Sequence, residues 1–289
     1  MHDEEWLADQ FESHRAHLRA VAYRMLGSRS DADDAVQEAW LRLARTDTSE
    51  VHNLGGWLTT VVARVCLDLL RSRRSRREEP IEARLPDPIL SREDRDDPEY
   101  AALRADSVGL ALLVVLDTLT PVERLAFVLH DMFGVPFTEI APIVGRSPGT
   151  ATQLASRARR RVRGAAPASD VDLVQQRRLV EAFLAAARDG DLDGLVAVLD
   201  PDVVLRIDSG AAGGLRQVRG VRTVAEGALT FSRVAAHAEP VIVNGVAGVL
   251  TTTPEGTPVS VTGCTVREGR IVAIDILADA ERLRALDLS

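Results

Sequence analysis

Residues 133–163, FGVPFTEIAPIVGRSPGTATQLASRARRRVR, carry the pattern that decides the fold. After Gly134 they predict a short helix over Glu139–Val144, a turn at Gly145 and Arg146, and a second helix over Pro148–Arg163 that Ser147 caps. Two helices joined by such a turn, with arginines at the far end of the second, are typical of a helix-turn-helix. An ordinary helical bundle with a solvated basic end would show the same pattern, so this stretch alone leaves both readings open.

The chain before this stretch also predicts helices. One is expected over Asp31–Ala44 behind a Ser30 cap, and a long one over Trp57–Arg77 after the loop Asn53–Gly56. Thr120–Glu123 predicts the start of a further helix, with Thr120 as the cap, proline at the first position and glutamate at the third. The first carries an acidic face with one exposed leucine opposite its apolar stripe. The second presents an aromatic ring, a threonine and arginines at three- and four-residue steps, which suits stacking on unpaired bases and holding a DNA backbone.

The remaining segments predict linkers and a different kind of domain. Residues 79–106 hold several prolines and a charge run, and residues 165–171 form a shorter linker. Two helices, a strand, a third helix and four more strands then predict an α+β domain whose antiparallel meander wraps the helices. The predicted fold class is multidomain: two all-α domains, the second a helix-turn-helix, followed by an α+β cone domain, with bounds 1–78, 107–165 and 172–289.

Composition narrows the class of protein. The chain has 289 residues, 46% hydrophobic and 27% charged, which excludes wholesale disorder. It lacks an apolar run of ~18 residues and starts with acidic residues, so we expect a cytoplasmic protein with no membrane contact. Cys66 and Cys264 give no disulfide or zinc framework. The net charge is −8, and two arginine clusters at 71–77 and 157–163 indicate local DNA contacts on an otherwise acidic chain.

Three stretches, in order, resemble bacterial sigma factors. Asp31–Leu41 resembles their polymerase-binding helix, Trp57–Arg71 their promoter-melting and −10-reading helix, and Phe133–Arg159 their −35-reading helix-turn-helix. A short linker in place of the intermediate sigma domain is typical of the extracytoplasmic-function (ECF) group. The tail resembles SnoaL-like domains of the NTF2-like superfamily, a fusion characteristic of the SigJ-like subgroup.

The resemblance implies an alternative sigma factor that binds RNA polymerase core and directs initiation at promoter DNA, with no enzyme activity, cofactor or metal of its own. The residues that it implies for core binding are Asp34, Gln37, Glu38 and Leu41. Those for −10 recognition and strand opening are Asn53, Trp57, Thr60, Arg64 and Arg71. Those for −35 recognition are Thr152, Gln153, Ser156 and Arg157, while Arg159–Arg161 and Arg163 are expected to meet phosphates or the polymerase.

The same resemblance implies that the tail modulates activity in cis and leaves a small-molecule ligand of the tail open. The subgroup has a linker motif, Gly-Pro-Trp-Leu-Pro-Glu-Pro, of which this chain retains only the second half, at Leu85–Pro88. The subgroup's second motif, Asn-Pro-Asp-Lys-Leu, corresponds to Asp279–Leu283, which keeps the acid, base and leucine but not the Asn-Pro. The implied regulatory contacts are Leu85, Pro86, Asp87, Pro88, Asp189, Gly190, Asp191, Leu192 and Leu283.

Two other function classes fit part of the pattern. A one-component helix-turn-helix regulator with a ligand-sensing tail would bind duplex DNA alone and would not need the acidic face of the Asp31–Ala44 helix. A tail-domain cyclase or isomerase would need pocket acids or bases. The candidates are Asp208 and Asp275, which could share a cavity, with His237 and Cys264, although Cys264 also suits a core and Asp275 a solvent face. His14 and His17 share helical spacing without a further metal ligand.

Overall fold

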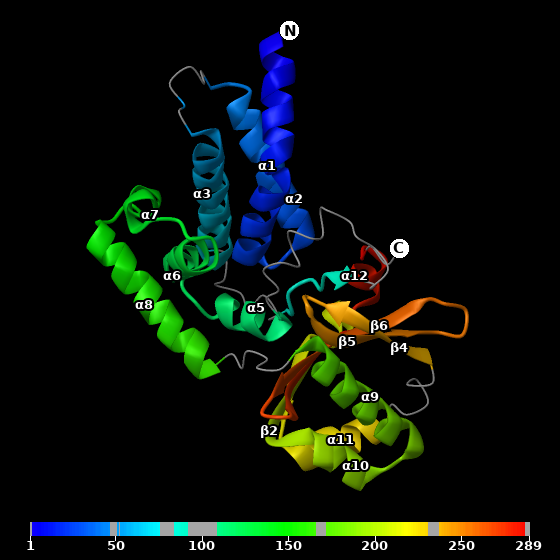
Figure 1. Cartoon of the computed structure of the whole chain (residues 1–289). Coiled ribbons are helices and arrows are strands. Elements are labelled where there is room, and N and C mark those ends of the chain that lie inside the picture. The colour runs from blue at the N-terminus through cyan, green and yellow to red at the C-terminus, as the bar shows by residue number, and fades with distance from the viewer. Residues whose placement is uncertain are drawn as a thin grey trace. The chain divides into compact units, whose positions relative to one another are not determined.

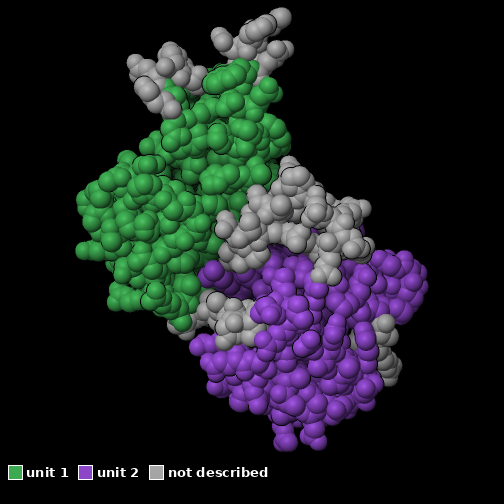
Figure 2. Space-filling view, viewed as in Figure 1, with its two compact units in different colours: residues 1–81, 98–106, 115–164 green, residues 82–97, 107–114, 165–289 purple. Residues whose placement is uncertain are grey.

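The computed structural model describes residues 2–46, 51, 53–75, 84–91, 109–165, 172–230 and 237–286. The chain divides into two compact units (Figure 2), one of residues 1–81, 98–106 and 115–164 and one of residues 82–97, 107–114 and 165–289. The described part of the predicted linker, residues 84–91, therefore belongs to the same unit as the tail. Arg76, Arg77 and the charge run at 92–97 lie outside the described residues. No described helix is long and apolar enough to cross a membrane.

The first unit starts with three helices (Figure 1): α1 (His2–Leu26), α2 (Arg29–Leu43) and α3 (Leu54–Ser75). Their apolar positions recur every three or four residues, so one stripe of each helix can be buried. In α2 the buried positions include Ala32, Val36, Ala39 and Leu43, and in α3 they include Leu58, Val61, Val62 and Val65. Outside these stripes, Asp34 and Gln37 of α2 and Arg64 and Asp68 of α3 are exposed.

The predicted cap of α2 was wrong by two residues. Ser28, not Ser30, has the extended cap conformation, and its Oγ accepts a hydrogen bond from the Asp31 amide at 3.3 Å. A serine hydroxyl at this position satisfies an amide that the first helical turn leaves without a partner. Ser30 is the second residue of the helix instead.

The predicted loop before α3 was also wrong, because the helix begins at Leu54 and includes both glycines. The Asn53 side-chain Oδ1 accepts a hydrogen bond from the Gly56 amide at 3.0 Å, which is the geometry of an N-cap. Two successive glycines suggested a loop in the sequence, but the cap and the packing of the helix outweigh their low helix propensity.

The helix-turn-helix is confirmed in the second half of this unit. It follows α5 (Leu110–Asp117), α6 (Pro121–Phe127) and a π-helical turn, η1 (Val128–Met132), and consists of α7 (Phe137–Val144) and α8 (Pro148–Ala165). Gly145 closes α7 with φ +67°, a left-handed conformation that glycine adopts without strain. The Ser147 Oγ accepts a hydrogen bond from the Thr150 amide at 3.3 Å, as the sequence predicted for the cap of the second helix.

The first helix of this motif starts earlier than predicted. The Pro136 carbonyl accepts hydrogen bonds from the amides of Glu139 and Ile140 at 3.0 and 3.1 Å, so α7 begins at Phe137 rather than Glu139. Pro142 therefore lies beyond the first turn of α7, where its missing N–H removes one backbone hydrogen bond.

The second unit is an α+β domain. Its helices are α9 (Leu173–Asp189), α10 (Leu192–Val198), α11 (Val221–Thr230) and α12 (Ala280–Arg284), with a short 3-10 turn, η2 (Gly210–Ala212). Its strands are β1 (Leu90–Ser91), β2 (Leu199–Asp208), β3 (Leu215–Arg219), β4 (Ala238–Val243), β5 (Val246–Thr252), β6 (Pro258–Arg267) and β7 (Arg270–Leu277). Among the described residues these strands form one sheet in the order β1-β4-β5-β6-β7-β2-β3.

The predicted meander is correct for β4 to β7 but incomplete. β2 pairs with β7 in parallel, with Arg206 opposite Asp275, so the sheet is mixed rather than antiparallel. β1, β3 and α12 were not predicted, because each is short and lacks a clear apolar period. The presence of β1 matters for function, since it brings two residues of the linker into the tail's sheet.

The core of the second unit lies between the sheet and α9, α10 and α11, which Figure 1 shows together beside the strands. Val180 of α9 and Leu195 of α10 are fully buried there, against Leu199, Ile271 and Ile274 of the sheet. Alternate strand residues point to this core, so the intervening positions, including Arg206, Asp208 and Asp275, face the other side of the sheet.

Candidate functional site

The outer face of α2 carries the residues predicted to bind the polymerase. Asp34 and Gln37 are exposed, and Leu41 keeps 42% of its surface exposed although it is a large apolar residue. Glu38 is half-buried and pairs with Arg42 at 2.9 Å, one turn further along the helix. The four positions form an acidic surface around one exposed leucine, which could receive a partner with an apolar pocket and basic rim.

The residues predicted for the −10 element lie along one side of α3. Asn53 caps the helix, Trp57 and Thr60 are half-buried, and Arg64 and Arg71 are exposed. The Thr60 hydroxyl donates to the Gly56 carbonyl at 3.0 Å, one turn earlier in the helix. Aromatic and guanidinium groups at this spacing can stack on and hold a single strand.

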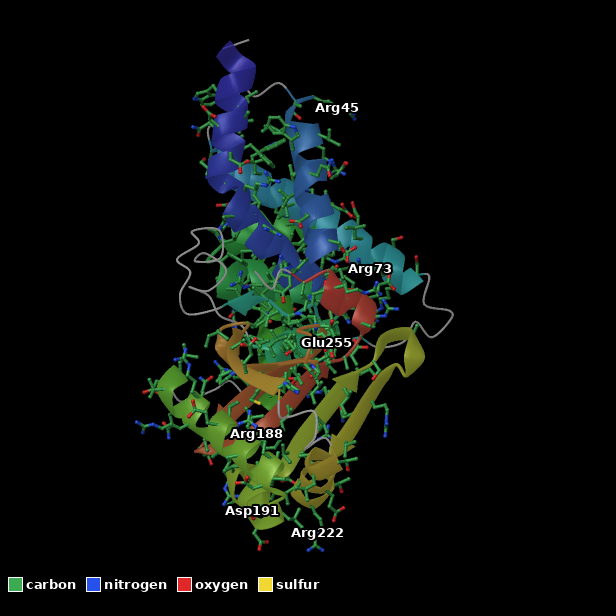
Figure 3. All side chains as sticks on the ribbon, turned by 90° about the vertical axis from the view of Figure 1, so that its right-hand side faces the viewer. Arg45, Arg73, Arg188, Asp191, Arg222 and Glu255 are labelled. Atoms are coloured by element: carbon green, nitrogen blue, oxygen red, sulfur yellow. The ribbon has the colours of Figure 1, made fainter. Side chains whose placement is uncertain are left out.

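The arginine cluster at the end of α3 is partly engaged with acids of the same unit. Arg73, labelled in Figure 3, pairs with Asp31 at 2.6 Å, which joins the end of α3 to the start of α2. Arg71 lies 3.7 Å from Asp68 in an exposed pair. An exposed pair such as Arg71–Asp68 is worth at most about 1 kcal/mol, so a phosphate can compete for Arg71.

The residues predicted for the −35 element lie on α8. Thr152, Gln153 and Arg157 are exposed and Ser156 is half-buried, so all four share the accessible side of the second helix of the helix-turn-helix. The Thr152 hydroxyl donates to the Pro148 carbonyl at 3.0 Å. Such a helix fits the major groove with its N-terminal half toward the base edges.

Acids on the preceding helices hold three arginines of α8. Glu123 of α6 accepts a hydrogen bond from Arg161 at 3.0 Å and lies 3.5 Å from the Arg157 Nε. Asp131 of η1 pairs with Arg159. Burial raises the pKa of Glu123, but hydrogen bonds from Thr120 and the charges of the two arginines outweigh this effect and leave the pKa below its usual value. Glu123 is thus a stable anion beneath α8.

The segment before the helix-turn-helix contacts α1 inside the first unit. The Phe133 ring meets the His17 ring edge-on at 5.2 Å between centroids, and the Arg24 guanidinium lies 4.9 Å from the centre of the same ring. The Arg24 carbonyl accepts two hydrogen bonds from the buried Arg124 side chain, at 3.1 and 3.2 Å. His17, which was considered as a metal ligand, therefore packs against an aromatic ring.

Asp208, at the end of β2, anchors the linker to the tail. Its side chain is fully buried, and its Oδ2 accepts hydrogen bonds from the Leu85 amide at 2.8 Å and from the Arg282 guanidinium at 2.7 Å. Its Oδ1 accepts one from the Gly210 amide at 3.0 Å. Each carboxylate oxygen therefore has a partner, which a buried charge requires.

Arg282 of α12 completes this contact. Its guanidinium donates to the Leu85 carbonyl at 2.6 Å and to the Asp87 carboxylate at 2.9 Å, in addition to Asp208. One planar donor group thereby joins two linker residues to a buried acid of the tail. The side chain of Asp279 caps the short helix that positions Arg282.

Asn244, in the turn between β4 and β5, holds the other end of the linker segment. The Ile89 amide donates to the Asn244 side chain at 2.9 Å, and the Asn244 amide donates back to the Ile89 carbonyl at 2.8 Å. Leu90 and Ser91 then pair with β4 as the edge strand β1. Four linker residues are buried here: Leu85, Pro86, Pro88 and Ile89. We call the contact between the linker residues Leu85–Ile89 and the tail residues Asp208, Asn244 and Arg282 the linker clamp.

The structure brings together only some of the predicted regulatory residues. Leu85–Pro88 lie against Asp208 and Arg282, and Leu283 is buried beside them in α12. Asp189–Leu192 form the turn between α9 and α10, where Asp191 caps α10, and Figures 1 and 3 place this turn at the opposite end of the tail unit from α12. The clamp residues that the sequence missed are Ile89, Asn244 and, as a linker contact, Asp208.

The acids proposed for tail catalysis have structural partners. Asp275 is 1% exposed, not on a solvent face, and pairs with Arg206 at 2.8 Å. Burial raises the pKa of Asp275, and the nearby Arg206 limits that rise. Cys264 lies in the core, where burial raises its pKa to about 12, and His237 is exposed. Asp208 belongs to the linker clamp.

Comparison with known proteins identifies the family. Sigma-70 region 2 matches residues 10–76, Sigma-70 region 4 matches 109–162, and the SnoaL-like domain matches 180–274. The ECF RNA polymerase sigma factor SigJ of Mycobacterium tuberculosis is 39% identical over 289 residues, covering 94% of this chain and 92% of SigJ. The chain belongs to the ECF RNA polymerase sigma factors. This sigma factor also matches the M. tuberculosis SigJ crystal structure at a TM-score of 0.79 and 35% identity, over 98% of this chain and 100% of that one.

A second relative covers less of the sigma factor. The probable ECF RNA polymerase sigma factor SigI of M. tuberculosis is 40% identical over 205 residues, which are 69% of each chain. The whole-length match to SigJ, with both sigma regions and the SnoaL-like tail, confirms the SigJ-like subgroup. The protein is an alternative sigma factor that binds RNA polymerase and directs it to promoters.

Proposed function

We propose that the SnoaL-like tail modulates transcription initiation in cis by binding the linker between the two sigma regions. The observation that carries this proposal is the linker clamp, in which Asp208, Asn244 and Arg282 hold residues 84–91 through backbone and side-chain hydrogen bonds. A linker bound along its length has fewer conformations than a free one, so the tail restricts how the regions on either side of it can be placed. Tethering keeps such a contact occupied even when it is weak.

Within this function the surfaces of the first unit receive separate roles. Asp34, Gln37, Glu38 and Leu41 bind the core enzyme, the α3 face from Asn53 to Arg71 serves the −10 element, and the α8 face from Thr152 to Arg157 reads the −35 element. The assignment is supported by the shared helix faces, on which these side chains are exposed or half-buried. The tail itself is not catalytic in this proposal, because its buried acids already hold Arg206, Arg282 and the linker.

Run-off transcription with core polymerase tests the proposal. A chain ending at Leu277 loses α12 and with it Arg282, so we expect its transcript yield to differ from that of the full chain by severalfold, with the same promoters used. Equal yields from the two chains would refute modulation in cis.

Replacing Glu38 with Ala and Leu41 with Asp should weaken core binding by tenfold or more. Losing an apolar anchor from the middle of an interface commonly costs ~2 kcal/mol. Both side chains lie at the helix surface, so helicity should be unchanged. Holoenzyme formation is measured by titrating labelled sigma factor with core enzyme, and Asp9→Ala and Glu12→Ala on α1 provide a matched control. Undiminished affinity of the double variant would contradict the core-binding assignment.

A further inference from the structure

Glu123 makes contacts beyond those its capping role requires. As the third residue of α6 it closes a capping box with Thr120, whose amide and hydroxyl donate to its Oε2 at 3.2 and 2.7 Å. The same carboxylate faces Arg157 and Arg161, which are one turn apart on α8 and so point to the same side. Its side chain is only 6% exposed, whereas each arginine is 52% exposed.

The contact with Arg157 uses one edge of the guanidinium. Glu123 lies 3.5 Å from the Nε, so this ion pair does not use the two terminal nitrogens of Arg157, whose side chain is 52% exposed. Bidentate recognition of guanine requires two neighbouring N–H donors in one plane, which the terminal nitrogens provide. A free arginine side chain would have to be ordered when DNA binds, and this ordering reduces affinity for the correct base.

A neighbouring pair provides a natural comparison. Asp131 holds Arg159 in the same way, from the segment before the helix-turn-helix to α8. Arg159 is half-buried and belongs to the arginines expected to meet phosphates, so fixing it cannot select a base. The two acids have the same charge but hold arginines of different roles.

We infer that Glu123 is a positioning residue for −35 recognition: it holds the Nε edge of Arg157 so that the terminal nitrogens are set for one base. The inference rests on the proposed −35 role of Arg157. Glu123 does not touch the DNA in this arrangement and acts only through the arginine. Discrimination at one base therefore depends on an acid in a different helix.

The test compares Glu123→Gln with the wild type in transcription by reconstituted holoenzyme from a promoter library with a randomised −35 element. Glutamine also suits the third position of a capping box, so α6 keeps its start while the carboxylate charge is lost. We expect preference at a single −35 position to fall about two- to tenfold, the range for ordering one flexible side chain. Arg157→Ala should relax the same position about tenfold or more, and adding Glu123→Gln to it should cause no further loss there.

Asp131→Asn is the matched control, and it should change yield about equally for all −35 sequences. If Glu123→Gln also changed the yield equally for all −35 sequences, or strengthened the base preference at the Arg157 position, the positioning role would be overturned. If Arg157→Ala left every −35 preference as in the wild type, the assignment of Arg157 itself would fail. If Arg157→Ala relaxed one position and Glu123→Gln did not, only the present inference would fail.

Discussion

Replacing Arg282 with Met is expected to release the linker from the tail and to speed amide exchange at Leu85 at least ~100-fold. The variant leaves the Asp208 carboxylate fully buried without its countercharge, and breaking a buried pair in this way costs ~3–5 kcal/mol. It also removes the donors to Asp87 and to the Leu85 carbonyl. Hydrogen exchange read by mass spectrometry on the full chain measures the effect directly, because the Leu85 amide is itself a donor in the clamp.

Arg284→Met is the matched control for this experiment. Arg284 lies on the same short helix but is exposed and donates only to the Ala280 carbonyl of its own helix in the contacts that the structure describes. Its loss should change local stability by less than about 0.5 kcal/mol. Similar exchange of residues 84–91 in both variants would mean that Arg282 does not hold the linker. The Ile89 amide, bonded to Asn244, shows whether the far end of the segment is released as well.

The helices were predictable because their signals are local. The Thr120–Glu123 capping box, the Gly145 turn and the Ser147 cap each lie within four residues in the sequence, and the structure confirms all three. The errors occurred where two local signals competed. Ser28 and Ser30 are both suitable caps, and the glycines before Trp57 suggest a loop unless Asn53 is recognised as the start of a helix.

The linker clamp was predictable only in part, because its contacts join residues far apart in the sequence. Resemblance pointed to Leu85, Asp87 and the Asp279–Leu283 segment, but nothing local indicates that Asp208 meets a linker amide 123 residues away. An acid at a strand end is equally compatible with a catalytic pocket, and so Asp208 was grouped with Asp275 as a possible catalyst. The parallel pairing of β2 with β7, which places Arg206 opposite Asp275, depends on the same long-range topology.

The second large effect concerns Arg206, whose loss should destabilise the tail unit by ~3–5 kcal/mol at neutral pH. Arg206 pairs at 2.8 Å with Asp275, which is 1% exposed, and Arg206→Met leaves that carboxyl buried without a countercharge. Double replacement, Arg206→Met with Asp275→Leu, removes both charges and should recover most of the loss. Arg267→Met, which breaks an exposed pair with Glu268, is the control and should have little effect.

The two cysteines allow each unit to be followed separately. Cys66 is buried in the first unit and Cys264 in the tail, and burial raises the pKa of each thiol to about 12, so neither reacts until its unit opens. The three tryptophans, Trp6, Trp40 and Trp57, all lie in the first unit, so their fluorescence does not report on the tail. Brief thiol labelling along a urea gradient should shift the Cys264 midpoint in Arg206→Met and leave the Cys66 midpoint unchanged.

The pH dependence distinguishes a buried charge from a simple loss of packing. Burial raises the pKa of Asp275 above its usual value, so the folded tail binds this proton more tightly than the unfolded chain does. The stability that comes from this difference is fully present below about pH 4 and is lost as the pH rises through the raised pKa. Arg206 limits this rise, and without it the carboxyl should stay protonated to higher pH. The deficit of Arg206→Met should therefore grow as the pH rises from about 4 toward neutral, while Arg206→Met with Asp275→Leu shows no such trend. A deficit that is constant over this range would assign the effect to packing of the arginine stem and not to the unpaired carboxylate.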